Sequence, residues 1–309
     1  MKSGFAVLIG RSNAGKSTLI NSLVGTKVAI TSPRPQTTRY SIHGVVNDDR
    51  GQIVFVDTPG VFTASHDHVT KSLAKSAEEA TRDIDVVLYV ADPTRAIGNE
   101  EHVALRLLET IKKPKILVLN KADVKRPAYK SEYLELGSKF DAVIEVSAKF
   151  GKYLGELKDK VMEFLPEGEP YYPPGQVSNL EQKQWLSELI REKIFLQTHQ
   201  EVPYSAAVEI EEIEERENGM VYLKANILTS APRYKKILVG ARGRRIKEIG
   251  QATRRELEAI WGKKVFLDLE VVVEEKWPER LFYSPVRTYP ATAERVKLYK
   301  KYEKIDYQI

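Results

Sequence analysis

Residues 10–17 have the sequence Gly-Arg-Ser-Asn-Ala-Gly-Lys-Ser, which is the G-x-x-x-x-G-K-[ST] spacing of a phosphate-binding loop. An apolar run at residues 5–9 precedes the loop and a helical pattern follows it, so backbone N–H groups and a helix N-terminus can surround one anion. Lys16 would reach the β- and γ-phosphates, and the Ser17 hydroxyl would bind Mg²⁺. The loop indicates a nucleoside triphosphate without specifying its base. The residues expected to contact the nucleotide here are Gly10, Arg11, Ser12, Asn13, Ala14, Gly15, Lys16, Ser17 and Thr18.

A second motif, Asp57-Thr58-Pro59-Gly60, follows the apolar residues 52–56. A carboxylate at the carboxyl end of a strand can hold a Mg²⁺-bound water, and the Gly60 N–H can meet the γ-phosphate. Residues 31–39, rich in proline and threonine, are predicted to form a switch loop whose threonine completes the Mg²⁺ shell while the γ-phosphate is present. Thr38 is preferred over Thr37, and an ordinary polar connection is the alternative for this loop taken alone. The expected Mg²⁺ ligands are Ser17, Thr38 and, through water, Asp57.

A third motif, Asn120-Lys121-Ala-Asp123, follows the apolar residues 116–119 and predicts which base is bound. The Asp123 carboxylate can accept hydrogen bonds from guanine N1–H and the 2-amino group, whereas adenine would leave it unpaired. Asn120 can hold the other edge of the base, and the Lys121 stem can pack on the ring. Backbone N–H groups of Ser147, Ala148 and Lys149, which follow another apolar run, can reach guanine O6. The predicted nucleotides are therefore GTP and GDP.

Position 61 is a valine, where Ras-like enzymes place a glutamine that orients the attacking water. Valine cannot do this, so we expect slow intrinsic hydrolysis, on the order of 10⁻³ s⁻¹. Asn13 is a candidate helper that would hold K⁺ beside the phosphates; the alternative is that Asn13 merely tolerates an unusual backbone angle. The expected catalytic residues are Asn13, Lys16, Thr38 and Gly60.

Strands and helices alternate from Phe5 to Leu165, which predicts an α/β doubly wound sheet with the nucleotide at its carboxyl edge. At 309 residues the chain is long enough for two domains. It has no cysteine, which excludes disulfides and thiolate metal sites. A charged-then-apolar leader and a long apolar span are both missing from the sequence, so a cytoplasmic protein is expected.

The second half is separated by residues 166–175, which contain four prolines and two glycines and predict a domain boundary. Beyond it the patterns predict the order α-β-β-α-α-β, with Asn218-Gly219 as the turn of a hairpin. Between residues 224 and 264 there are twelve basic and three acidic residues, although the net charge of the whole chain is only +5. This local excess predicts a polyanionic partner.

The turn Gly240-Ala-Arg-Gly243 lies between two predicted helices inside this basic segment. A G-x-x-G turn with arginines after it lets a nucleic-acid backbone approach closely, while an ordinary helix-connecting turn is the alternative. We expect an apolar groove for unstacked bases, lined by Ile246 and Ile249 of the second helix together with the adjacent edge strand. The predicted RNA-binding residues are Lys236, Gly240, Ala241, Arg242, Gly243, Arg244, Arg245, Ile246, Lys247, Ile249 and Arg254.

The chain resembles the Era family of ribosome-associated GTPases. The segments that carry the resemblance are Gln36-Thr-Thr-Arg39, Asp57-Thr-Pro-Gly60, Asn120-Lys-Ala-Asp123, Pro166-Glu-Gly-Glu-Pro170, Arg191-Glu-Lys193, Val202-Pro-Tyr204 and Val239-Gly-Ala-Arg-Gly243. It departs from the family at Arg11-Ser12 and Ala14, which replace lysine-proline and valine. The resemblance implies a Ras-like G domain at residues 1–166, a linker at 167–178 and a smaller α+β type II KH domain at 179–276. A basic, aromatic tail at 277–309 is longer than the family leads us to expect, and either stacks on RNA or is a solvated helix.

The resemblance also implies a function. Such a protein converts GTP to GDP and phosphate, binds small-subunit (16S) ribosomal RNA near its 3′ end and assists maturation of the 30S subunit. It also implies peripheral contact with the inner face of the cell membrane. A monomer is expected. The alternative function is a GTP-dependent switch that acts at a membrane or on a protein partner through its C-terminal half.

Overall fold

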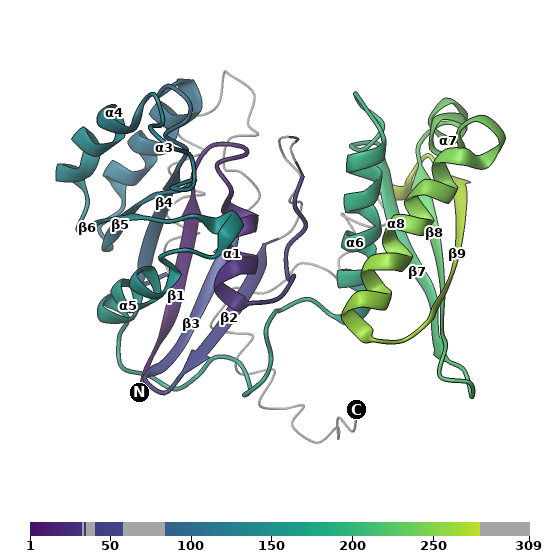
Figure 1. The fold of residues 1–309 in the computed structure, drawn as a ribbon, viewed down its shortest axis with the longest axis horizontal. Coiled ribbons are helices and arrows are strands. Elements are labelled where there is room, and N and C mark those ends of the chain that lie inside the picture. The colour runs from purple at the N-terminus through teal and green to yellow at the C-terminus, as the bar shows by residue number, and fades with distance from the viewer. Residues whose placement is uncertain (33, 35–40, 58–83, 279–309) are drawn as a thin grey trace. The chain divides into compact units, whose positions relative to one another are not determined.

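The computed structural model describes residues 1–32, 34, 41–57 and 84–278, which form two compact units (Figure 1). The first unit contains the described residues of Met1–Ala29 and Arg34–Asn179. The second contains those of Ile30–Pro33 and Leu180–Tyr289.

The first unit is a six-stranded sheet with the strand order β2-β3-β1-β4-β5-β6. Among its described strands, β2 and β3 pair antiparallel and the other adjacent strands are parallel. The strands are β1 (Lys2–Ile9), β2 (Ile42–Asp48), β3 (Gly51–Asp57), β4 (Val86–Ala91), β5 (Lys115–Leu119) and β6 (Ala142–Glu145). The helices are α1 (Lys16–Val24), α3 (Asn99–Thr110), α4 (Lys130–Glu135) and α5 (Leu154–Phe164), with 3₁₀ turns η1 (Leu136–Lys139) and η2 (Ala148–Phe150).

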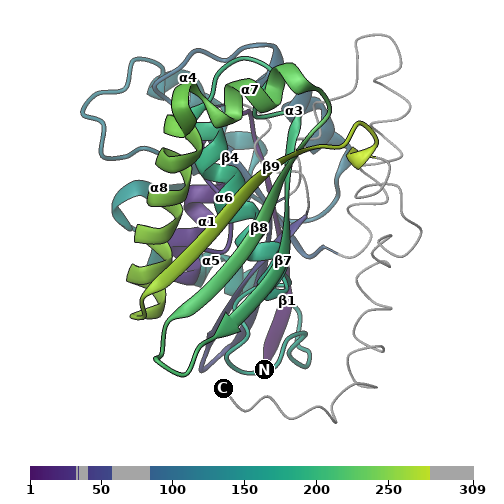
Figure 2. The ribbon, with the colours of Figure 1, turned by 90° about the vertical axis from the view of Figure 1, so that its right-hand side faces the viewer.

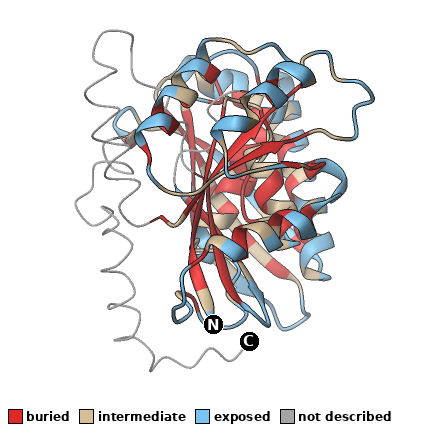
Figure 3. Ribbon diagram, turned by 90° about the vertical axis from the view of Figure 1, so that its left-hand side faces the viewer, coloured by how far each residue is buried: buried red, intermediate tan, exposed pale blue. Residues whose placement is uncertain are grey.

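Helices cover both faces of this sheet, so its central strands are buried almost throughout (Figure 3). Alternate residues along β1 enter different cores, because successive side chains point to opposite faces. Leu8 packs with residues of α1 and α5, whereas Val7 packs with residues of α3 and α4. This confirms the predicted doubly wound fold, and it explains why the strands read as continuous apolar runs.

Residues 167–179, most of which were predicted to form the linker, pack against the first unit. The Gln52 side chain accepts hydrogen bonds from the backbone N–H groups of Tyr171 and Tyr172 and donates one to the Tyr172 carbonyl. The Tyr172 hydroxyl lies 2.6 Å from His43 Nδ1, and the Val45 N–H donates to Val177. The prolines exclude a helix or a central strand here, but the segment still makes specific hydrogen bonds to the first unit. The division between the two units comes between Asn179 and Leu180.

The second unit has the predicted α-β-β-α-α-β order. Its sheet order is β7-β8-β9, with β7 antiparallel and β9 parallel to β8, and a helical layer packs on one face of it (Figure 2). The elements are α6 (Gln182–Gln197), β7 (Ala206–Glu215), β8 (Val221–Thr229), α7 (Pro232–Val239), η3 (Ala241–Gly243), α8 (Arg244–Trp261) and β9 (Val265–Val273).

Charged side chains are buried along α6. Arg191 donates two hydrogen bonds to the Glu188 carboxylate one turn earlier, and both residues are buried. Lys193 pairs with Glu192 and with Glu256 of α8, which ties the two helices together.

We expect Arg191→Met to destabilise the second unit by about 3–5 kcal/mol, because it leaves the Glu188 carboxylate buried without its cation. The matched control is Glu188→Leu combined with Arg191→Met, which removes both charges and should cost much less. Urea unfolding of the second unit within the full chain measures the difference. Equal midpoints for the single and double variants would show that the pair is not energetically coupled.

Candidate functional sites

The loop between β1 and α1 requires its two glycines. A Cβ at Gly10 would lie 2.3 Å from the carbonyl oxygen of Val90, and one at Gly15 would lie 2.3 Å from Asn120 Nδ2. Gly15 also has φ 97°, in the left-handed region that favours glycine. The loop is therefore packed tightly against β4 and against the motif predicted to bind the base.

Lys16 and Ser17 begin α1 and lie beside the end of β3. Lys16 Nζ donates to the carbonyl oxygens of Gly10 and Arg11 at 2.8 and 2.9 Å. Burial lowers the pKa of Lys16, while the carboxylates of Asp57 and Glu100 oppose this shift. These contacts hold the ammonium group inside the loop where a polyphosphate would lie.

The Ser17 hydroxyl donates to Asp57 Oδ2 at 2.6 Å. A hydroxyl and a carboxylate are hard oxygen ligands of the kind that Mg²⁺ prefers, so this pair fits the predicted metal. Thr38, Thr58, Pro59, Gly60 and Val61 lie outside the described residues.

The lowered pKa of Lys16 predicts that nucleotide binding takes up a proton. The nucleotide-free protein loses the Lys16 proton at a lower pH than free lysine does, and a bound polyphosphate would raise the pKa again. GTP affinity should therefore fall as pH rises between the lowered and the ordinary lysine pKa. Calorimetry in two buffers with different ionisation enthalpies measures the uptake, and Lys16→Arg should abolish it because arginine stays charged. Proton uptake that persists in Lys16→Arg would assign the effect to another group.

Asn120 connects three of the predicted nucleotide motifs. Its Nδ2 donates to the Ala14 carbonyl at 2.8 Å, and its Oδ1 accepts from the backbone N–H groups of Lys121 and Ala148 at 2.8 and 3.0 Å. Asp123 Oδ1 accepts from the Ser147 hydroxyl. The structure thus brings the phosphate loop, the base motif and residues 147–148 together. The Lys149 ammonium lies 5.1 Å from the centre of the Phe150 ring, whereas the prediction for Lys149 concerns its backbone N–H.

Three acidic residues near this site were not predicted from the sequence: Asp92, Glu100 and Glu101. Asp92 is 1 % exposed and accepts from Lys121 Nζ and Thr94 Oγ1. Burial works to raise the pKa of Asp92, but the hydrogen bonds from Lys121 and Thr94 outweigh it and hold the pKa below its usual range. The Lys121 head group is thus fixed while its stem remains free to pack on a base.

Two glutamates at the start of α3 contact the phosphate loop. Glu100 accepts from the Ser12 N–H at 2.7 Å, and Glu101 pairs with Arg11 at 2.7 Å. The unusual Arg11-Ser12 sequence was the available signal, because a partly buried arginine is usually paired with an acidic side chain. Asn13 has φ 63°, the unusual backbone angle of the alternative interpretation.

The turn after α7 is similarly constrained. Gly240 and Gly243 have φ 73° and 74°, and Arg242 between them has φ 51°. A Cβ at Gly240 would lie 2.8 Å from the Cβ of Arg245. Ala241 and Arg242 are exposed at the tip of the turn, as the prediction required.

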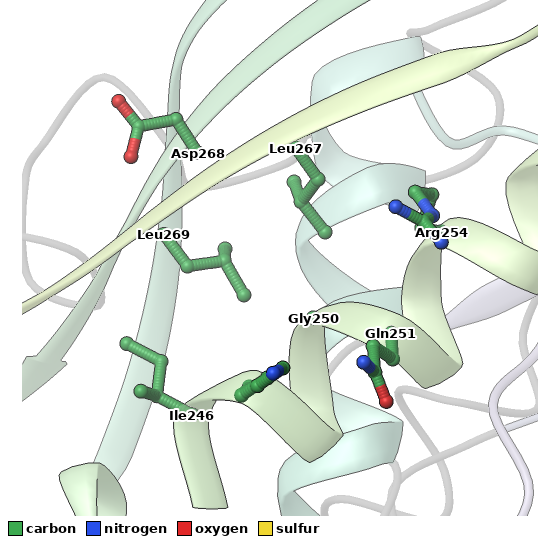
Figure 4. A pocket seen from close by; sticks show the side chains of 8 residues that line it. Ile246, Gly250, Gln251, Arg254, Leu267, Asp268 and Leu269 are labelled. Carbon is green, nitrogen blue, oxygen red and sulfur yellow. The ribbon is translucent and has the colours of Figure 1, made fainter. Parts of the chain in front are cut away.

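A groove of about 390 Å³ lies between α8 and the edge strand β9 (Figure 4). Leu267 and Leu269 point into it from the strand, and the helix supplies the opposite wall. Ile249 was predicted to line the groove, and this was wrong: its side chain is 0 % exposed and belongs to the core between helices and sheet. The lining residues are Ile246, Lys247, Gly250, Gln251, Arg254, Leu267, Asp268 and Leu269.

Both sites together define a class of protein: a phosphate-loop GTPase followed by a KH domain. Residues 5–121 match the family described as "50S ribosome-binding GTPase", and residues 201–278 match the family described as "KH domain". The "GTPase Era" proteins of Halothermothrix orenii and Thermotoga maritima are each 42 % identical to the chain, covering 90 % and 91 % of it and 95 % of each relative. The chain therefore belongs to the Era family of GTPases, and it hydrolyses GTP to GDP and phosphate.

Solved structures agree with this assignment. A point variant of Aquifex aeolicus Era bound to GDP·AlF₄⁻ matches with a TM-score of 0.80 and 36 % identity, covering 92 % of this chain and 97 % of that one. Era in complex with MgGDPNP and nucleotides 1506–1542 of 16S ribosomal RNA matches with a TM-score of 0.79 and 35 % identity at the same coverage. Across the described residues, none of the helices has the length and apolar character needed to cross a membrane.

Proposed function

We propose that this GTPase binds small-subunit ribosomal RNA near its 3′ end and assists maturation of the 30S subunit, with GTP as the timing signal. The observation that carries the proposal is the groove beside the Gly240–Gly243 turn, which combines an apolar wall with the basic side chains of α8. A similar protein has been solved with nucleotides 1506–1542 of 16S ribosomal RNA, which supports the choice of partner. The bound strand would place its backbone on the turn and its bases in the groove.

In the proposed mechanism, the phosphate-loop N–H groups and Lys16 hold the phosphates and stabilise the charge of the transferring group. Ser17 and Thr38 would ligate Mg²⁺ directly, with Asp57 acting through a water, and the metal would neutralise charge on the phosphates. The Gly60 N–H would sense the γ-phosphate. Asp123, Asn120 and the residue 147–149 backbone would select guanine.

The proposed domain limits are residues 1–166 for the GTPase and 179–276 for the KH domain. Because the two proposed binding sites belong to different domains, we expect substitutions in one site to leave the affinity for the other ligand unchanged.

The proposed place of action is the cytoplasm, with peripheral contact to the membrane. Cosedimentation with anionic vesicles tests the membrane contact.

Hydrolysis is expected to be slow and independent of the residue-61 side chain. Val61→Ala should leave the basal rate nearly unchanged, because neither side chain can orient water. Replacing Na⁺ by K⁺ should raise the rate if Asn13 holds the ion, and Asn13→Ala should then remove the stimulation. Phosphate-release assays in the two salts measure both effects. If K⁺ has no effect and Asn13→Ala hydrolyses at the original rate, Asn13 has only a structural role.

The proposed partner is tested with purified components. The protein, loaded with a non-hydrolysable GTP analogue, is titrated with the 3′-terminal segment of small-subunit ribosomal RNA and with an internal segment of equal length. We expect clear preference for the 3′ segment and a log–log salt slope of about −0.7 per neutralised phosphate. Equal affinity for both segments would reject the 3′ assignment, and no RNA affinity would favour the membrane or protein-partner alternative.

A further inference from the structure

The sheet of the second unit has one face away from its helices. The paired residues Ala207, Leu228 and Val272 lie in one row of this outer face, and Tyr222 and Phe266 lie in a row at its other end. Most of the acidic side chains of β7 and β9 lie on this outer face or at its β7 edge. We call the following carboxylate residues the acidic sheet face: Glu209, Glu211, Glu212, Glu214, Asp268 and Glu270.

One lysine lies within this face. Lys224 pairs with Glu211 at 2.7 Å, and that carboxylate also accepts from Asn226. The Asp268 side chain points away from those of Leu267 and Leu269 (Figure 4), as the alternation of side chains along a strand requires. The unit is therefore strongly polarised, with basic helices on one side and a carboxylate-rich sheet on the other.

This polarity determines what the acidic sheet face can bind. A nucleic-acid backbone would be repelled by six carboxylates, so the face cannot extend the basic surface of α8. A cationic occupant is favoured by charge complementarity.

The chain itself leaves the described structure from this face. Trp277 is buried against Ala207 and Leu228, with Val272 packed beside them. The Glu274 N–H donates to Thr229, and the Trp277 N–H donates to Glu274, which turns the chain from the end of β9 onto the outer face. The described chain therefore ends on the same face of the sheet as these carboxylates.

The residues that follow in the sequence have a complementary composition. Residues 279–309 contain seven basic and four acidic side chains and six aromatic ones. Thirty-one extended residues reach up to roughly 100 Å, whereas a nine-residue strand is about 30 Å long, so the segment is long enough to cross the sheet.

The far end of the face offers a place for aromatic side chains. The Arg216 guanidinium lies 4.7 Å from the Tyr222 ring centre and 5.8 Å from that of Phe266, and the two rings are stacked. Phe266 remains 51 % exposed, so one side of this stack is open to another ring.

We propose that residues 279–309 bind in cis to the acidic sheet face of the same chain, starting from Trp277. Lysines and arginines of the segment pair with the carboxylates, and its aromatic side chains extend the Tyr222–Phe266 stack. This binding depends only on the second unit and the tail, and therefore stands or fails independently of the proposed ribosomal partner.

The test uses the full chain and zero-length carbodiimide cross-linking, which joins lysine amines to carboxylates in contact. We expect links within one molecule from Lys297, Lys300, Lys301 or Lys304 to carboxylates of the acidic sheet face. A mixture of isotope-labelled and unlabelled protein separates these from links between molecules. Links to carboxylates elsewhere, or only between molecules, would overturn the proposal.

Hydrogen exchange provides the second readout. In Asp268→Lys combined with Glu270→Lys, amides of residues 279–309 should exchange roughly tenfold faster, because two attractive contacts become repulsive. Glu212→Lys combined with Glu214→Lys makes the same charge change on β7. It should accelerate exchange of the tail amides as well, which shows that the effect does not come from strand β9 alone. The matched control is Glu132→Lys with Glu135→Lys, two exposed residues of α4.

The proposal fails if the tail amides of the unaltered protein already exchange at the unprotected rate. It also fails if the control variant accelerates exchange as much as the acidic-face variants do. Protection of the tail that appears only when RNA is added would instead identify the tail as an RNA-binding arm.

Discussion

Asp123→Asn should lower GTP affinity by about 10⁴-fold and create affinity for xanthosine triphosphate. The Asp123 carboxylate accepts from guanine N1–H and the 2-amino group in our account, whereas an asparagine amide presents a donor that suits the 2-oxo group of xanthine. Equilibrium titration with fluorescent GTP and XTP analogues measures both changes.

The control for this exchange is Ser147→Ala. It removes the hydroxyl that donates to Asp123 Oδ1 while keeping the carboxylate, and should weaken GTP binding without favouring XTP. Equal binding of GTP and ATP by the unaltered protein would reject the role of Asp123, as would an Asp123→Asn variant that still prefers GTP.

Replacing Ala241 and Arg242 together by Asp should reduce RNA affinity by at least about a hundredfold, while GTP affinity is retained. Two carboxylates would then lie where the nucleic-acid backbone approaches, and one guanidinium would be lost. Both positions are exposed, and aspartate tolerates the left-handed backbone of Arg242, so the fold should survive. RNA titrations at several salt concentrations measure the loss of affinity and the smaller salt slope.

The first unit offers a matched control for these two substitutions. Arg126 and Ala128 lie in an exposed loop, and Arg126 also has a left-handed backbone with φ 52°. Replacing both by Asp changes the net charge by the same amount without altering the turn. If this control loses as much RNA affinity as the Ala241 and Arg242 variant, overall charge rather than the turn controls binding.

The fold was largely predictable because local and long-range signals agree. Buried parallel strands appear as apolar runs, and the amphipathic strand β8 and the glycine-flanked turn at residues 240–243 have clear patterns. Strand β2 was missed, because His43 and Gly44 interrupt its apolar pattern and its burial depends on partners far along the chain. The packing of residues 167–179 was missed for the same reason, since Gln52 holds them through side-chain hydrogen bonds that no spacing reveals.

The sites show a similar limit. Motifs located the phosphate loop and the base motif, because their chemistry requires fixed residue types at fixed spacing. Asp92 and Glu100 act from neighbouring elements, so only the fold brings them to Lys121 and Ser12. Ile249 was misplaced because a helix period assigns a face only approximately, and in the structure its side chain belongs to the buried core of the second unit.

Crosslinking and sequencing of RNA bound to the protein in cells tests whether the chain binds the 3′ end of small-subunit ribosomal RNA through the 240–243 turn. We expect reads from the unaltered protein to concentrate at that 3′ end. The peak should disappear in the variant with Asp at positions 241 and 242 and persist in the variant with Asp at positions 126 and 128. Reads spread over unrelated RNAs, or an unchanged peak in the 241 and 242 variant, would contradict this binding.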